Sequence, residues 1–161
     1  MQDEIEYGIV GRVVGAPFAV LVAEELFASG CQLLISITSA GQILPLGQPP
    51  YVILIDKALR DEGTSYHYLP PAPYSYLPPA LREVVSAHWD SRQVLLHVGA
   101  SWTTDAPFRE TETLIALRRT EGILAVEMEA AALYATLAGQ AVPDHLLCPC
   151  DEPDGTDRGR F

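Results

Sequence analysis

Two glutamates that flank a methionine are the residues of this sequence best suited to chemistry. Glu127 and Glu129 enclose Met128 directly after the apolar run 123–126. Burying a carboxylate there is costly unless it meets partners. A carboxylate accepts paired hydrogen bonds, so one of the two could hold the 2′- and 3′-hydroxyls of a ribose while the methionine packs against the sugar. The alternative interpretation is a helix N-terminus, where the helix dipole favours glutamates.

A second candidate site is a loop of four small residues. Thr38, Ser39, Ala40 and Gly41 follow the apolar run 33–37. Their backbone N–H groups and two hydroxyls offer hydrogen bonds to an anion, and no bulky side chain blocks its approach. The segment is therefore a candidate phosphate site, with an ordinary turn between a strand and a helix as the alternative.

The segment 103–109 mixes hydroxyls, a carboxylate, an aromatic ring and a guanidinium. This set is suited to stacking on a nucleobase and reading its edge by hydrogen bonds. The candidate base-binding residues are Thr104, Asp105, Phe108 and Arg109. The alternative interpretation is a capped turn before a helix that begins near Glu110.

Several of these segments together resemble one known family. The stretch Val126–Tyr134 closely resembles the ribose-binding signature of the purine and uridine phosphorylases. Further resemblance, in the family's order, lies in the segments 14–17, 38–41, 61–65 and 103–108. The resemblance covers residues 14–138, which is most of the chain.

The resemblance implies phosphorolysis of a purine or pyrimidine nucleoside to a free base and ribose 1-phosphate. Inorganic phosphate would be the co-substrate, and no other cofactor is implied. Residues 38–41 would bind phosphate, residues 127–129 would bind ribose, and the candidate base-binding residues would hold the base. Relatives assemble from several subunits, so a homo-oligomer is expected. No residue stands out as the general acid, and the catalytic residues remain unassigned.

Two departures from the family pattern leave other functions open. Many relatives have a phosphate-binding arginine where this chain has Ser36. The family's first strand and glycine-rich phosphate loop should precede Val14, and thirteen residues cannot hold them. The alternatives are a nucleosidase that uses water in place of phosphate and a truncated remnant without catalytic activity.

Composition excludes several other classes of function. The 161 residues carry ten basic and twenty-one acidic side chains, for a net charge of −11, which repels nucleic acids. No apolar run approaches the roughly 18 residues of a membrane span. The acidic start lacks the basic, apolar pattern of a signal peptide, so a cytoplasmic location is expected. Three cysteines, two of them at 148 and 150, do not form a metal-binding pattern, and we expect no metal.

The chain alternates predicted helices and strands. Helices are predicted at 17–29, 79–88, 110–120 and 130–138, and strands at 33–37, 51–55, 93–98 and 123–126. The proline-rich stretch 66–79 is predicted to be an ordered loop. Such alternation indicates an α/β fold. With the resemblance, we expect a three-layer sandwich in which helices flank a central mixed sheet, incomplete relative to the family.

The last twenty residues differ in character from the rest. We expect a partial nucleoside phosphorylase domain at 1–141 and a divergent tail at 142–161. Residues 148–155 are rich in turn-forming and charged residues where the family has an apolar strand. Read one base later, degenerate codons for residues 148–154 permit Ala-His-Val-Thr-Asn-Gln-Met, which resembles a family strand and loop. Our hypothesis is a frameshift near residue 140, with disorder in the tail.

Overall fold

A computed structural model describes residues 6–139, which form a mixed five-stranded sheet with helices on both faces. The strand order is β1-β5-β4-β2-β3. The strands are β1 (Gly41–Gln42), β2 (Tyr51–Asp61), β3 (Tyr74–Tyr76), β4 (Leu95–Thr104) and β5 (Ala125–Glu127). The three central strands are parallel, whereas β1 and β3 pair antiparallel at the edges.

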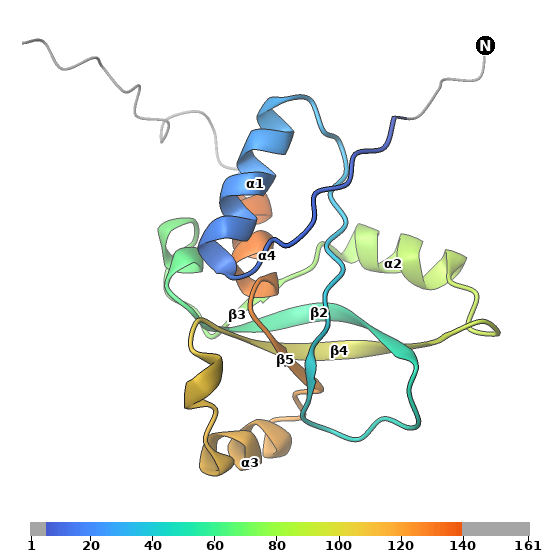
Figure 1. The fold of residues 1–161 in the computed structure, drawn as a ribbon, viewed down its shortest axis with the longest axis vertical. Helices are drawn as coiled ribbons and strands as arrows, with labels where there is room; N and C mark the ends of the chain where they lie inside the picture. Colours follow the sequence, from blue (N-terminus) through green and yellow to red (C-terminus); the bar gives the residue numbers. More distant parts are fainter. Residues whose placement is uncertain (1–5, 140–161) are drawn as a thin grey trace, which may run out of the picture.

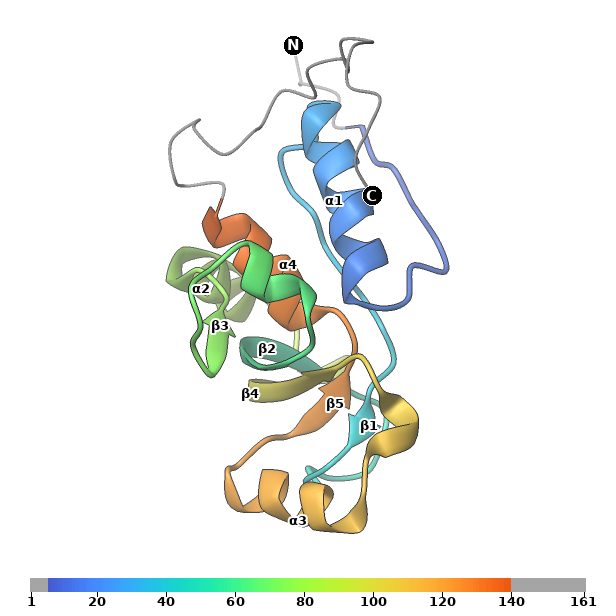
Figure 2. The ribbon, with the colours of Figure 1, turned by 90° about the vertical axis from the view of Figure 1, so that its left-hand side faces the viewer.

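The helices form the two outer layers. They are α1 (Ala16–Ala28), α2 (Pro79–His88), α3 (Glu112–Thr120) and α4 (Ala130–Gly139), with short 3₁₀ turns η1 (Thr64–His67) and η2 (Pro107–Arg109). Figures 1 and 2 show α1, α2 and α4 on one side of the sheet and α3 on the other. The predicted three-layer α/β fold is confirmed.

The four helices lie where the sequence predicted them because their ends carry clear signals. Pro17 occupies the first turn of α1, and Gly30 follows the helix with a φ of +96°, a conformation that glycine adopts without strain. The side chain of Thr111 accepts a hydrogen bond from the backbone N–H of Leu114 and so caps α3.

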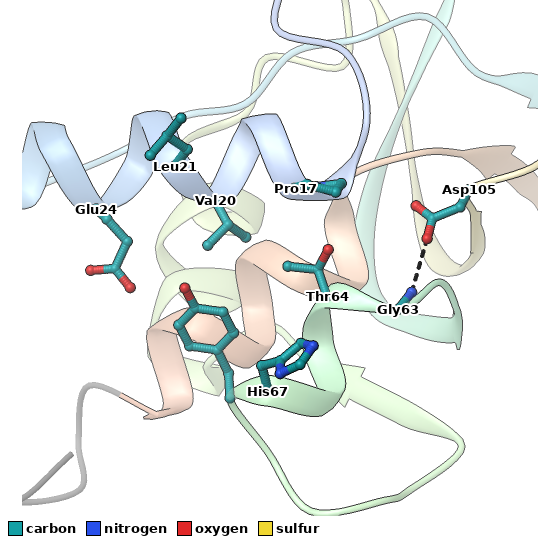
Figure 3. Close-up of a pocket in the computed structure, with 9 residues that line it drawn as sticks. Pro17, Val20, Leu21, Glu24, Gly63, Thr64, His67 and Asp105 are labelled. Carbon is teal, nitrogen blue, oxygen red and sulfur yellow. Dashed lines mark hydrogen bonds between the residues drawn. The ribbon is translucent and has the colours of Figure 1, made fainter. Parts of the chain in front are cut away.

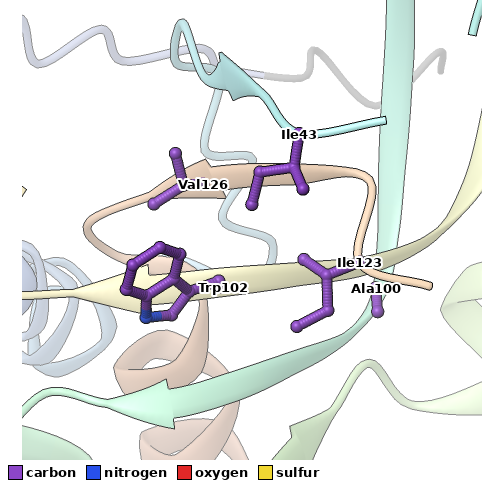
Figure 4. Packing of buried hydrophobic residues seen from close by; sticks show 5 residues of the cluster. All are labelled: Ile43, Ala100, Trp102, Ile123 and Val126. Carbon is purple, nitrogen blue, oxygen red and sulfur yellow. The ribbon is translucent and has the colours of Figure 1, made fainter. Parts of the chain in front are cut away.

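The core is divided between the two faces of the sheet. On one face Trp102 packs with Ile43, Ala100, Ile123 and Val126, as Figure 4 shows. On the other face α4 contributes small side chains, which let the helix approach both the sheet and α1. The buried alanines of α4 are Ala130, Ala131, Ala132 and Ala135.

The prediction of a buried strand at 33–37 is wrong. This segment is assigned no strand, and Leu33, Ile35 and Ile37 are 60%, 71% and 91% exposed. The apolar, β-branched composition is that of a strand, but a strand also needs a hydrogen-bonded neighbour. Within residues 6–139 no strand pairs with the segment 33–37. The first residue after it that pairs in the sheet is Gly41, at the start of β1.

The stretch 66–79 contains more regular structure than the sequence predicted. Residues 74–76 pair with β2 as the edge strand β3, and the prolines lie outside the paired residues. β2 itself extends to Asp61, beyond the predicted end at residue 55, after a register irregularity between Ile55 and Lys57. The predicted tail at 142–161, with both of its cysteines, lies outside the described residues.

Candidate functional site

A cavity of about 300 Å³ brings together two of the segments that the sequence singled out. Its lining residues are Val14, Thr38, Ser39, Gly41, Pro107, Glu110, Val126, Glu127, Met128 and Glu129. It lies where β4 and β5 reach their carboxyl ends, the edge at which ligands gather in open α/β sheets. The loop 38–41 and the triplet 127–129 are more than eighty residues apart in sequence, and they meet here.

Glu127 is almost fully enclosed by hydrogen-bond donors. Its Oε1 accepts from Ser101 Oγ at 2.9 Å and from Thr103 Oγ1 at 2.5 Å. Its Oε2 accepts from the backbone N–H groups of Glu129 at 2.8 Å and Ala130 at 2.6 Å. Four bonds use most of the acceptor capacity of a carboxylate. Glu127 therefore caps the start of α4, as the helix N-terminus interpretation expected.

Burial also sets the ionisation of this group. Glu127 is 4% exposed, and its removal from water raises the pKa of the carboxyl above the ordinary glutamate value. The hydrogen bonds from Thr103 and from the backbone lower the pKa, but burial is the larger effect. The structure thus makes Glu127 an internal hydrogen-bond acceptor that is costly to ionise.

Glu129 has a different environment. Its Oε1 accepts from the backbone N–H of Gly15 at 2.7 Å, and its Oε2 accepts from that of Met128 at 3.2 Å. Two bonds leave about half of the acceptor positions of a carboxylate unused. The residue is 6% exposed and lines the cavity, so the remaining positions are candidate contacts for a ligand. The bond to Gly15 also ties the start of α1 to the cavity wall.

The small-residue loop is held against β5 by a close backbone approach. Gly41 pairs with Val126, and a Cβ at position 41 would lie 2.8 Å from a methyl carbon of Val126. Only glycine fits this distance without movement. Thr38 and Ser39 are exposed and line the cavity, whereas Ala40 is exposed and does not line it.

The four candidate base-binding residues are not gathered in this cavity. Thr104 is buried, and its hydroxyl accepts a hydrogen bond from the N–H of Ala106. Asp105 accepts from the N–H of Gly63 in another cavity. Phe108 is fully exposed and Arg109 is exposed, both on η2.

The end of this segment and the residue after it instead contribute two lining residues that the sequence did not single out. They are Pro107 and Glu110, and burial raises the pKa of the Glu110 carboxyl. Val14 and Val126 also line the cavity. The motif resemblance at 14–17 was the one signal that could have placed Val14 there; Glu110 has no comparable signal.

A larger cavity of about 570 Å³ lies between α1 and η1. Figure 3 shows side chains of both elements directed into it, including Glu24, Thr64 and His67. Burial, followed by the nearby Glu24, raises the pKa of Tyr68 at its edge. Of the candidate residues it contains only Asp105, so we assign the candidate site to the smaller cavity, which holds both glutamates and the loop.

The charge of the smaller cavity limits its chemistry. Three of its lining residues are glutamates, and none of those described is an arginine, lysine or histidine. Carboxylates accept hydrogen bonds from hydroxyls, so the wall formed by Glu129 suits a polyol such as a sugar. The 38–41 side contributes the hydroxyls of Thr38 and Ser39, of which that of Thr38 donates to the Ser39 carbonyl, and no cation is among these lining residues.

Fold and site together define an α/β domain with a carboxylate-walled pocket at the carboxyl ends of its parallel strands. The family model described as the Phosphorylase superfamily matches residues 5–143. The chain therefore belongs to the phosphorylase superfamily, and the resemblance seen in the sequence is confirmed.

Individual relatives agree with this assignment. The chain is 26% identical over 151 residues to a guanosine phosphorylase of Halorubrum lacusprofundi, covering 92% of this chain and 62% of the relative. The structure is similar to uridine phosphorylase from Vibrio fischeri, with a TM-score of 0.70, 30% identity and coverage of 78% of this chain and 54% of that one. AMP nucleosidase from Bacteroides thetaiotaomicron shares the fold, with a TM-score of 0.69, 22% identity and coverage of 81% and 55%. The chain thus spans little more than half the length of these relatives.

Within residues 6–139 no helix combines the length and apolar character needed to cross a bilayer. No group of three or more histidine, cysteine, aspartate or glutamate side chains in the same range is placed to hold a metal ion.

Proposed function

We propose that this chain binds a nucleoside in the smaller cavity and contributes to its phosphorolysis, yielding a free base and ribose 1-phosphate. The observation that carries the proposal is the Glu129 carboxylate, which lines the cavity with unused acceptor positions beside Met128 and opposite the loop 38–41. Family membership supports the same reading.

Within this proposal the ribose is held by the triplet 127–129. Glu129 accepts hydrogen bonds from the 2′- and 3′-hydroxyls, and the half-buried Met128 packs against the sugar. Glu127 has its acceptors occupied by protein donors, so its contribution is to hold the backbone of the triplet. Ribose contact and backbone support are thus divided between the two glutamates.

Phosphate would lie against Thr38, Ser39 and the backbone of residues 40–41, as the only co-substrate and with no other cofactor. Its charge is not balanced by any basic residue among those lining the cavity. A basic group from another segment or another subunit would complete this half of the site. We therefore include a homo-oligomer in the proposal, and the exposed apolar side chains of Leu33, Ile35 and Ile37 offer a surface for assembly.

The base would lie toward the segment 104–110. Thr104 and Asp105 shape the chain before η2, whereas Phe108 and Arg109 are exposed beside the cavity-lining Pro107. Both a guanosine and a uridine phosphorylase are among the relatives, so purine and pyrimidine nucleosides are both to be tested. The acidic chain, which resembles enzymes of nucleoside metabolism, is proposed to act in the cytoplasm.

A nucleosidase is the second candidate, and one observation favours it. The cavity lining lacks a basic side chain, and Ser36, the counterpart of a phosphate-binding arginine in many relatives, is exposed and does not line the cavity. Water is neutral and needs no such cation. In that case the same ribose contacts would serve hydrolysis of the glycosidic bond.

The test is incubation of the full chain with guanosine, inosine, adenosine and uridine, with and without phosphate, while free base is followed by chromatography. Base release that requires phosphate is expected. Glu129→Gln should lower it, whereas Glu25→Gln, an exposed carboxylate on α1, should leave it unchanged. Release without phosphate would favour the nucleosidase, and no release from any nucleoside would contradict a catalytic role for this chain.

A further inference from the structure

We infer that Thr103 is a positioning residue, which sets the direction of the Glu129 carboxylate without touching the ligand. The inference rests on the proposed nucleoside-binding function and deepens it. Thr103 lies on β4, is fully buried and is absent from the lining of the cavity. Any effect it has on a bound sugar must therefore pass through other residues.

The hydroxyl of Thr103 connects three parts of the fold. It donates to Glu127 Oε1 at 2.5 Å and accepts from the backbone N–H of Ala131 at 3.0 Å. One oxygen atom thus joins β4, the end of β5 and the first turn of α4. Threonine is branched at Cβ, which limits its χ1 rotamers and keeps the hydroxyl in place.

The connection continues from Glu127 to the backbone of the next residues. Glu127 Oε2 accepts from the N–H groups of Glu129 and Ala130, so the main chain at position 129 is fixed from within the core. The Glu129 side chain is held at its other end by the N–H of Gly15. The unused acceptor positions of Glu129 consequently have a defined direction. This direction depends on the Thr103 hydroxyl, because that hydroxyl keeps Glu127 in its rotamer.

This arrangement makes a specific prediction about selectivity. A carboxylate that grips two vicinal hydroxyls depends on orientation, and small displacements of binding groups can cost about two orders of magnitude. Loss of the Thr103 hydroxyl should therefore weaken binding of a ribonucleoside but not of its 2′,3′-dideoxy analogue, which has no diol to grip. A general loss of stability would weaken both equally.

The experiment measures dissociation constants of guanosine and uridine, and of their 2′,3′-dideoxy analogues, by calorimetry with the full chain. Thr103→Val removes the hydroxyl at nearly constant shape, and Thr103→Ser restores it. Thr136→Val is the matched control, because this buried threonine donates within α4 to Ala132 and lies outside the cavity. The preference for the ribonucleoside should fall about tenfold or more in Thr103→Val, return in Thr103→Ser, and remain in Thr136→Val.

The outcomes separate this inference from the proposed function. If the unaltered chain binds no nucleoside or shows no preference for the diol, the proposed function fails and the inference falls with it. If the unaltered chain prefers the ribonucleoside and Thr103→Val keeps that preference, the function stands and the positioning role is overturned. If Thr103→Val does not fold, Thr103→Cys replaces the hydroxyl that donates to Glu127 with a thiol, a weak donor; a reduced preference supports the inference, and an unchanged one overturns it.

Discussion

Glu127→Ala should destabilise the domain strongly, because it removes the hydrogen-bond acceptor that caps the start of α4. The N–H groups of Glu129 and Ala130 lose their partner, and the hydroxyls of Ser101 and Thr103 lose an acceptor. The surrounding residues are buried, so water does not readily replace these bonds. The substitution therefore tests whether this carboxylate has a structural function in addition to its position in the site.

The magnitude follows from the bonds lost. A buried donor without a partner costs about 1–3 kcal/mol, so the two backbone groups together cost about 2–6 kcal/mol. Removing a carboxylate whose pKa is raised by burial returns part of this, because the ionised form is unfavourable in the folded state. We expect a net loss of about 3 kcal/mol, a large share of the roughly 5–15 kcal/mol that stabilises a typical domain.

Urea unfolding measured by tryptophan fluorescence provides the assay, since Trp102 is 1% exposed and reports on the core, whereas Trp89 is 36% exposed. Glu127→Gln is the comparison: its amide oxygen can still accept from the two N–H groups and its nitrogen can donate to the hydroxyls, so a smaller loss of about 1 kcal/mol is expected. If the unfolding free energy of Glu127→Ala lies within about 0.5 kcal/mol of that of the unaltered chain, as expected for a substitution at an exposed site, the capping role assigned to Glu127 is refuted.

Three further results are expected. The pKa of Glu127 is raised in the folded state, so the contribution of this group to stability is fully present below the ordinary glutamate pKa and is lost as pH rises through the folded-state pKa. Unfolding free energies measured across acid and neutral pH should show this loss. The same loss should be absent in Glu127→Gln, which has no carboxyl group at this position. Gly41→Ala would place a Cβ 2.8 Å from a methyl group of β5 and should lower stability by about 1–3 kcal/mol. Gly11→Ala is the control, because a Cβ at position 11 would have no atom within 4 Å and should not lower stability. Equal melting temperatures of the two variants would contradict the close approach at Gly41. Trp102→Phe removes the 2.8 Å bond from Nε1 to Asp61 and should cost about 2 kcal/mol in thermal unfolding, and an unchanged melting temperature would argue against that bond.

The helices were predictable because their signals are local. Pro17 and Gly30 bracket α1, Pro79 opens α2, and the alanine-rich run from 130 onward has high helix propensity. The central parallel strands were predictable in position as short apolar runs. Their ends were less so, because the extension of β2 to Asp61 depends on pairing with β4 rather than on composition.

The segment 33–37 shows a property that local composition does not determine. Its composition predicts a buried strand, but burial depends on a partner that a local pattern does not specify. Edge strand β3 was missed for the opposite reason: proline-rich flanks predict a loop, and only the long-range pairing of Tyr74 and Tyr76 with β2 makes it a strand.

The candidate site was predictable in part. The segments 38–41 and 127–129 were each singled out from their residue types, and the structure places them in one cavity. The different surroundings of Glu127 and Glu129 were not predictable, because they depend on donors far away in sequence. Ser101 and Thr103 lie 26 and 24 residues from Glu127, and Gly15 lies 114 residues from Glu129. The surroundings of the candidate base-binding residues were the least predictable part of the site, because successive residues from Thr104 to Glu110 differ in burial.

Binding of a nucleoside in the smaller cavity through the 127–129 triplet is tested most directly by NMR of methionine methyl groups. The chain has two methionines, and Met128 lines the cavity, so labelling the methyl carbons gives a signal from the candidate site, which its loss in Met128→Leu would assign. Titration with guanosine or uridine should shift the Met128 signal saturably, with a weaker response to the 2′,3′-dideoxy analogue. A Met128 signal that does not move at any soluble concentration of either nucleoside would contradict the assignment of this cavity.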